Sequence, residues 1–183
     1  MTTYLSNDLS RRGLLVGLAA IAASPAWATT VAGARDLVSD LVNDISRIVA
    51  SGQSDAAILR EFETVFRTYG DVPAIARSAL GPTARSLSSS ELNSYTSAFQ
   101  GYMSRKYGKR FREFSGGRIE VNGAQQVGRF FEVSTTAFLR GTAPFDVTFV
   151  VSDRSGTDRF VNILIEGVNM LATERVEITA LLD

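Results

Sequence analysis

Apolar residues in the segment 31–107 recur every three or four positions. This spacing is typical of helices that bury one face. Glycine, proline and small polar residues divide the pattern into four parts. We therefore expect four helices: one over 31–49 that ends before Gly52, one from Ser54 to Tyr69 stopped by Gly70, a short one from Asp71 and Pro73 to Leu80, and one from Ser88 to about Gly108.

The second and fourth predicted helices carry many of the aromatic rings of the chain. The fourth helix begins with Ser88 and Glu91, which stand three positions apart and form a capping-box pattern. The rings either fill an ordinary core or line a cavity, and the sequence leaves both interpretations open. They are Phe62, Phe66, Tyr69, Tyr95, Phe99 and Tyr102.

From Gly116 onward the apolar spacing changes to the two-residue period of strands. Short connections between these strands indicate antiparallel neighbours. The run 160–170 is the most apolar, and we expect the helices to pack on it. The segment 174–182 fits a helix or a strand. Strands are expected over 118–121, 129–139, 145–151 and 160–165, with turns at Gly116-Gly117, Asn122-Gly123, Gly141 and Ser155-Gly156.

Helices followed by a meander of strands predict one α+β domain with helices packed on one face of a curved antiparallel sheet. Such a sheet, wrapped by helices, tends toward a half-open cone. The mouth of that cone is a natural place for a ligand.

Composition narrows the possible functions. Lys+Arg and Asp+Glu are both 19, so the charge balance does not argue for nucleic acid as a partner. The chain has no His and no Cys, which excludes disulfides, thiol nucleophiles, Ser-His triads and the usual zinc sites. We expect no metal and no cofactor, and any enzyme here would have to work with carboxylates, Lys, Tyr, Ser or Thr. Besides ligand binding at the cone, two other functions stay open. One is a small exported enzyme that uses Glu132, Asp146 or Glu166 as a buried base, and the other is a structural adaptor with a solid interior.

The N-terminal segment has the three parts of an export signal. Arg11 and Arg12 precede an apolar run over 13–23, and Ala26-Trp27-Ala28 supplies small residues at a cleavage site. The apolar run is about half of the roughly 20 residues that span a bilayer. We predict a signal peptide over 1–28, cleaved after Ala28, and one domain over 29–183. The paired arginines favour the twin-arginine route, with an ordinary Sec signal as the alternative.

A basic cluster closes the fourth predicted helix. It is either a solvated face, favourable near a helix C-terminus, or a site for a phosphate head group or an acidic partner. Its members are Arg105, Lys106, Lys109, Arg110 and Arg112.

Three short segments, in this order and spacing, carry a family resemblance. They are Ala79-Leu80-Gly81, the stretch 98–103 (AFQGYM) with Tyr107-Gly108, and the stretch 165–171 (IEGVNML). With the export signal, the chain from Ala34 to Arg175 resembles the MlaC or toluene-tolerance family of periplasmic phospholipid-binding proteins. The chain departs from the family pattern at Pro82–Arg85 and at Arg159-Phe160, where relatives often carry Trp, and in the tail after Met170.

The resemblance implies a periplasmic lipid shuttle with an NTF2-like fold and no catalysis. It would carry phospholipid between an outer-membrane lipoprotein complex and an inner-membrane ABC transporter, and so maintain the lipid asymmetry of the outer membrane. A diacyl lipid has about 30 methylenes, and at about 0.8 kcal/mol each they cost more than about 20 kcal/mol to expose to water. A carrier therefore needs a dry apolar slot.

We expect that slot between the sheet and the helices. The predicted tail-facing residues are Phe62, Phe66, Phe99, Tyr102, Phe149, Val151, Ile163 and Ile165. The predicted contacts to a head group or a partner are Arg105, Lys109 and Arg110.

Overall fold

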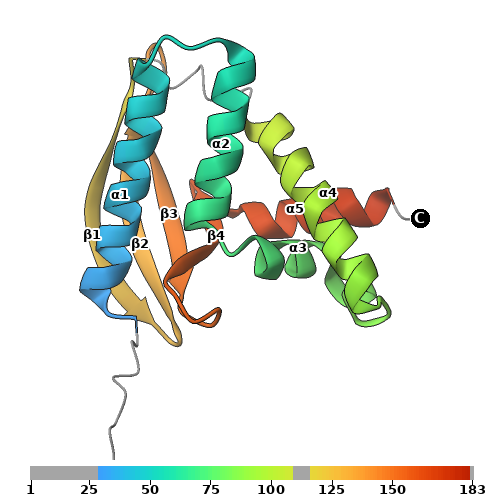
Figure 1. Ribbon diagram of the computed structural model, residues 1–183. Coiled ribbons are helices and arrows are strands. Elements are labelled where there is room, and N and C mark those ends of the chain that lie inside the picture. Colours follow the sequence, from blue (N-terminus) through green and yellow to red (C-terminus); the bar gives the residue numbers. More distant parts are fainter. Residues whose placement is uncertain (1–28, 109–115, 182–183) are drawn as a thin grey trace, which may run out of the picture.

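The chain folds as helices, then a sheet, then a last helix (Figure 1). The computed structural model describes residues 29–108 and 116–181. The predicted signal peptide lies outside the described residues. The elements are α1 (Val31–Ala50), α2 (Asp55–Tyr69), α3 (Val72–Leu80), the 3-10 turn η1 (Gly81–Arg85), α4 (Ser89–Gly108), β1 (Arg118–Val127), β2 (Phe130–Phe138), β3 (Phe145–Ser152), β4 (Arg159–Ile165), β5 (Val168–Asn169) and α5 (Met170–Ala180).

The four helices predicted from the apolar spacing are confirmed to within a few residues. Their caps explain where they begin. The Thr30 side chain accepts a hydrogen bond from the backbone of Gly33 at the start of α1. At α4, the Ser88 amide donates to Glu91 Oε2 at 2.8 Å and the Glu91 amide donates to Ser88 Oγ at 3.3 Å. These two bonds are the predicted capping box.

The sheet is antiparallel with the strands in chain order, β1-β2-β3-β4-β5. One predicted turn is wrong: β1 continues through Asn122-Gly123, where the register with β2 shifts. A glycine in a strand can accommodate a bulge as well as a turn, and here the longer pairing with β2 decides for the bulge. The hairpin turn comes later, at Gly128, with a φ of 61°.

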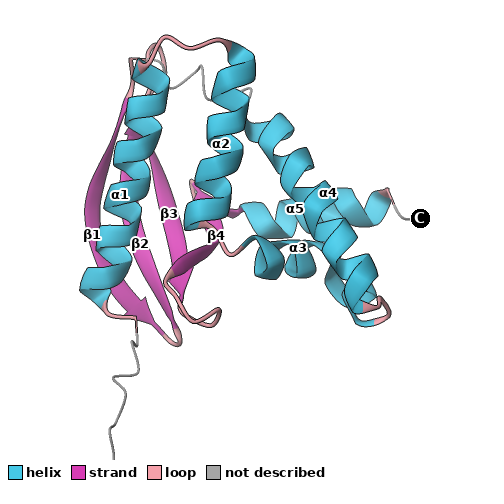
Figure 2. Cartoon of the chain, in the orientation of Figure 1, coloured by secondary structure: helices cyan, strands magenta, loops and turns pink. Residues whose placement is uncertain are grey.

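The helices cover one face of the sheet and extend past its β4 edge (Figure 2). Helix α1 lies along β1 and β2, and α2 lies between α1 and α4. Helices α3, α4 and α5 form a second group, in which α3 packs against both of the others and α4 also packs against α2. The α+β plan with helices on one face is therefore confirmed.

The expectation that the run 160–170 is the main surface for the helices is wrong. Strand β4 forms within it, but α1 packs on β1 and β2, while β4 contacts α3 and α5. The α2–α3 junction is tied to this edge, because the Asp71 amide donates to the Phe160 carbonyl at 2.9 Å. An apolar run predicts that a strand is buried, but it does not identify the element that packs against that strand.

The C-terminal segment, for which the sequence allowed a helix or a strand, is the helix α5. The side chain of Asn169 caps it by accepting from the Ala172 amide at 2.9 Å. Its β-branched Val176 points outward and is exposed. The contacts of α5 with α3 and β4 therefore outweigh the weak strand preference of its side chains.

Candidate functional site

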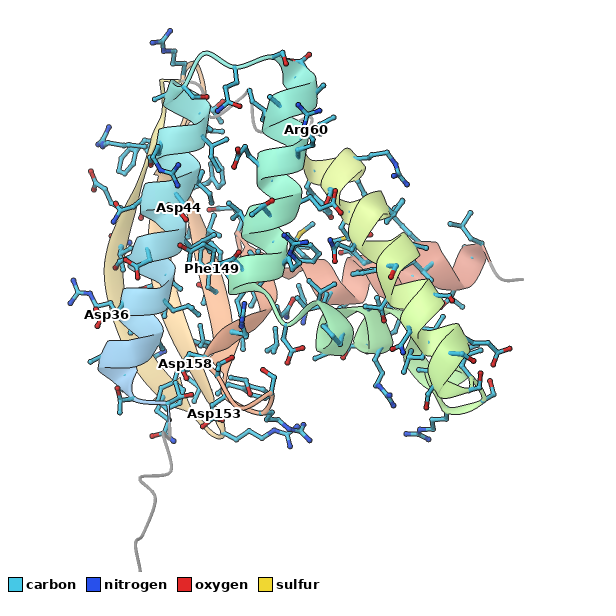
Figure 3. All side chains as sticks on the ribbon, in the orientation of Figure 1. Asp36, Asp44, Arg60, Phe149, Asp153 and Asp158 are labelled. Carbon is cyan, nitrogen blue, oxygen red and sulfur yellow. The ribbon has the colours of Figure 1, made fainter. Side chains whose placement is uncertain are left out.

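The inner face of the sheet is an apolar layer. The register places Val133, Phe149 and Ile163 side by side on β2, β3 and β4, and Val147 beside Ile165. Phe149 and Val151 are 5% and 0% exposed, whereas Ile163 and Ile165 are only partly buried. Figure 3 shows Phe149 in the interior, between the sheet and the helices. These four predicted tail-facing residues therefore share one face of the sheet.

A chain of aromatic rings connects this face to α2. The rings of Phe62 and Phe66 stack at 6.4 Å, and Phe66 lies 6.0 Å from Phe160. Phe160 meets Phe149 edge-on, at 6.1 Å and 71°. The prediction omitted Phe160 from the site, although it is the first apolar residue of β4. Its position opposite Val151 follows from the strand register, which sequence spacing alone does not fix.

The two predicted residues of α4 lie in different surroundings. Phe99 is 2% exposed and packs 6.0 Å from Tyr95 within the main core. Tyr102 instead lies at the boundary with α5, where its hydroxyl donates to Glu177 Oε2 at 3.2 Å. The structure therefore brings Tyr102 into a polar group of residues.

Two surface hollows lie outside this layer. One, of about 370 Å³, opens between the C-terminal end of α1 and the start of β1 and includes Ile45, Val49 and Ile119. The other, of about 360 Å³, lies between α3, η1 and α5 and includes Arg77, Arg85 and Arg175. Neither hollow is lined by any of the eight predicted tail-facing residues, so the expected slot between sheet and helices stays a prediction.

The predicted head-group residues are only partly within the described chain. Arg105 is exposed near the end of α4, and Lys109 and Arg110 lie outside the described residues. Lys106, from the same basic cluster, is engaged in an ion pair. Its Nζ lies 2.7 Å from Glu174 Oε1 and 2.5 Å from Glu177 Oε2.

A buried carboxylate at this place was missed by the sequence analysis. Glu174 of α5 is 1% exposed and accepts hydrogen bonds from Lys106 and from the Tyr107 hydroxyl. Burial of the ammonium lowers the pKa of Lys106, but the hydrogen bonds to Glu174 and Glu177 together raise it by more. The net result is a pKa above the usual value. The pKa of Tyr107 is raised, chiefly by burial and secondly by its hydrogen bond to Glu174.

This polar cluster joins α4 to α5. Its signal in the sequence is faint: a glutamate inside an otherwise amphipathic tail, with its cation on another helix 68 residues away. The Glu174 Oε2 atom has no hydrogen-bond partner among the described residues. The cluster can hold two helices together, because its ion pair and hydrogen bonds run from α4 to α5.

The three candidate bases do not gather in a buried site. Asp146 and Glu166 are exposed and Glu132 is partly exposed. Glu166 accepts a hydrogen bond from the Asp146 amide, which is a structural role. Arg175 donates to the Ser78 carbonyl at 2.8 Å.

Within the described ranges 29–108 and 116–181, no helix combines the length and the apolar character that a membrane span requires.

Comparisons with known proteins identify a matching family and a solved structure of similar fold. The profile of the MlaC protein family matches residues 38–183. A solved structure of a phospholipid-binding protein from Ralstonia solanacearum, in complex with a phospholipid, superposes with a TM-score of 0.71 at 13% identity, over 80% of this chain and 86% of that one. At that identity the likeness concerns the fold. The search of curated protein sequences gave no match. Because the family profile spans most of the chain, the chain belongs to the MlaC family.

Proposed function

We propose that this protein is an exported carrier that binds phospholipid tails between the inner face of its sheet and its helices. Membership of the MlaC family supports the proposal, as does the phospholipid bound by the structural neighbour. The observation that carries it is the continuous apolar layer from Ile163 through Phe149 and Phe160 to α2. It offers the dry surface that acyl chains require.

The partly buried members of the layer suggest where tails would enter. Phe62, Ile163 and Val147 pack against the core without being fully covered. The Phe66, Phe149 and Phe160 rings already touch, so tails would occupy the space by separating the helices from the sheet. Separating two packed rings costs about 0.5–1.5 kcal/mol beyond the area uncovered, whereas each methylene that a tail buries gains about 0.8 kcal/mol, and a tail has many.

In the cell, the proposed carrier moves lipid between an outer-membrane lipoprotein complex and an inner-membrane ABC transporter, across the periplasm. A soluble carrier suits this task because lipid tails cost more than about 20 kcal/mol to expose to water. The predicted signal over 1–28 would deliver the chain to that compartment.

The test is mass spectrometry of an organic extract of the protein purified from a periplasm. Phospholipid at a fixed ratio to protein is expected. A pair of variants localises the site: Ile163→Gln places an amide on the inner face, while Leu164→Gln places it on the outer face, opposite Thr148. An unsatisfied buried amide costs about 1–3 kcal/mol, or roughly a 5- to 150-fold loss of affinity.

We therefore expect Ile163→Gln to lose most of its lipid and Leu164→Gln to keep it. If the wild-type protein and both variants carry no phospholipid, the carrier proposal fails and a structural adaptor is favoured. Equal lipid in both variants would place the tails elsewhere on the molecule.

A further inference from the structure

The first described residue, Thr29, is held by two carboxylates. Its backbone nitrogen donates to Asp153 Oδ2 at 3.1 Å, and its hydroxyl donates to Asp158 Oδ1 at 2.6 Å. Thr29 itself is only 9% exposed. Figure 3 shows both aspartates at the β3–β4 hairpin, beside the start of α1.

Among the described residues, no cation pairs with these two carboxylates. Neither Asp153 nor Asp158 forms an ion pair with any residue in the ranges 29–108 and 116–181, and both are half-buried. Two like charges close together repel unless a positive group lies between them. The N-terminal end of α1 has no acidic residue in its own first turn, and Asp158 Oδ2 lies close to Gly33 of that turn, where a helix carries a partial positive charge.

The backbone around them permits this close approach. A Cβ atom added at Gly33 would lie 3.0 Å from Asp158 Oδ2, which is tighter than an ordinary contact. Glycine at this position therefore lets the Asp158 carboxylate reach the first turn of α1. The arrangement joins the start of the described chain, Thr29 to Gly33, to the β3–β4 hairpin, which is far away in the sequence.

We propose that export processing completes this site: cleavage after Ala28 turns the Thr29 nitrogen into the N-terminal ammonium, which Asp153 binds while Asp158 holds the Thr29 hydroxyl beside it. In the precursor the peptide nitrogen has one proton and no charge. In the processed chain it has three donors and a positive charge, and charge-assisted hydrogen bonds are roughly twice as strong as neutral ones. This inference rests on the export part of the proposed function and is independent of lipid binding.

Two consequences follow from the geometry. Cleavage adds a positive charge to a nitrogen that already lies 3.1 Å from Asp153 Oδ2. The ion pair then ties the start of α1 to the β3–β4 hairpin only in the processed chain. Maturation and the final stability of the fold are thereby coupled.

The test compares purified chains that begin at Thr29 with a free amine and with an acetylated amine, in urea unfolding. An exposed ion pair lowers the unfolding equilibrium constant a fewfold, and hydrogen bonds to charged groups lower it by a larger factor. We expect acetylation to raise the unfolding equilibrium constant roughly tenfold, which is about 1.4 kcal/mol. A chain that begins at Ala28 moves the amine by about 3.8 Å without removing it, and should behave like the acetylated chain.

The same comparison in Asp153→Asn/Asp158→Asn should show little effect of acetylation. Asp36→Asn, an exposed aspartate on the outer side of α1, removes one negative charge elsewhere and should keep the full effect. Equal effects in all three backgrounds, or none in the wild type, would overturn the proposal. It would also fail if sequencing of the exported protein gave a first residue other than Thr29.

Discussion

Replacement of Lys106 by Met tests how the buried Glu174 is held. Lys106 Nζ lies 2.7 Å from Glu174 Oε1, and Glu174 is 1% exposed. The substitution keeps much of the aliphatic stem of the side chain and removes its charge, so Glu174 is left buried with a hydrogen bond from Tyr107. Removal of one partner from a buried ion pair costs about 3–5 kcal/mol, chiefly because the other charge stays uncompensated.

The structure favours the lower end of that range. Lys106 is 28% exposed, so water can reach its end of the pair, and the Tyr107 hydroxyl still satisfies one lone pair of Glu174. We expect Lys106→Met to lower the free energy of unfolding by about 3 kcal/mol. For a domain of this size, that corresponds to a fall in Tm of roughly 6–12 °C.

Urea unfolding and differential scanning calorimetry at pH 7 measure the effect. Glu177→Gln is the matched control, because Glu177 bonds the same ammonium but is 46% exposed, and exposed pairs contribute about 0.2–1 kcal/mol. The double variant Lys106→Met/Glu174→Gln removes the buried charge and should be more stable than Lys106→Met alone. The reasoning is refuted if Lys106→Met costs no more than Glu177→Gln, or if the second substitution destabilises the protein further.

The pH dependence of the same pair has a definite sign. Burial opposes the charge on Lys106, but its hydrogen bonds to Glu174 and Glu177 prevail, so its folded pKa lies above the unfolded value of about 10.4. A group with a raised pKa stabilises the fold fully below the unfolded pKa. Its contribution is lost only as pH rises through the folded pKa. Between neutral pH and about pH 10 the difference between wild type and Lys106→Met should therefore be constant, and it should shrink in more alkaline solution.

Two further predictions concern other parts of the chain. Burial raises the pKa of Tyr69 and of Tyr95 to about 12, so their phenols stay protonated in the folded protein at pH 11, and absorbance at 295 nm should rise there only on unfolding; full ionisation at pH 11 without unfolding would contradict this. Glu166 has a φ of 49° and accepts from the Asp146 amide, so Glu166→Ala loses the bond and keeps a backbone strain of about 1–2 kcal/mol, whereas Glu166→Gly loses the bond and relieves the strain. Thermal unfolding should rank Glu166→Gly above Glu166→Ala, and the reverse order would contradict the strain argument.

The local elements were predictable because their signals are local. The Ser88–Glu91 capping box and the stop at Gly70 set helix boundaries through atoms a few residues apart. The alternation along β3 placed Phe149 and Val151 on one face, and both are buried there. The same rules allowed a turn at Asn122-Gly123, where pairing with the longer β2 gave a bulge instead.

The candidate site was predictable in composition and less so in arrangement. The sequence indicated apolar rings on α2 and on the sheet, and these do meet. It did not indicate that Tyr102 faces α5, or that Phe160 joins the two sets of rings. Both depend on how helices are placed around the β4 edge, and the apolar period of a helix says which face is buried without naming its neighbour.

By itself, the sequence determined the four helices, the strands that follow them and the two-layer plan, because hydrophobic period, caps and turn residues act within a few positions; it left the last segment open between helix and strand. Only the tertiary structure decided which polar groups meet. Glu174 finds Lys106 across 68 positions, and Thr29 finds Asp153 across 124. Such pairs are fixed by packing of distant segments, and a buried charge keeps its place only where that packing delivers a partner.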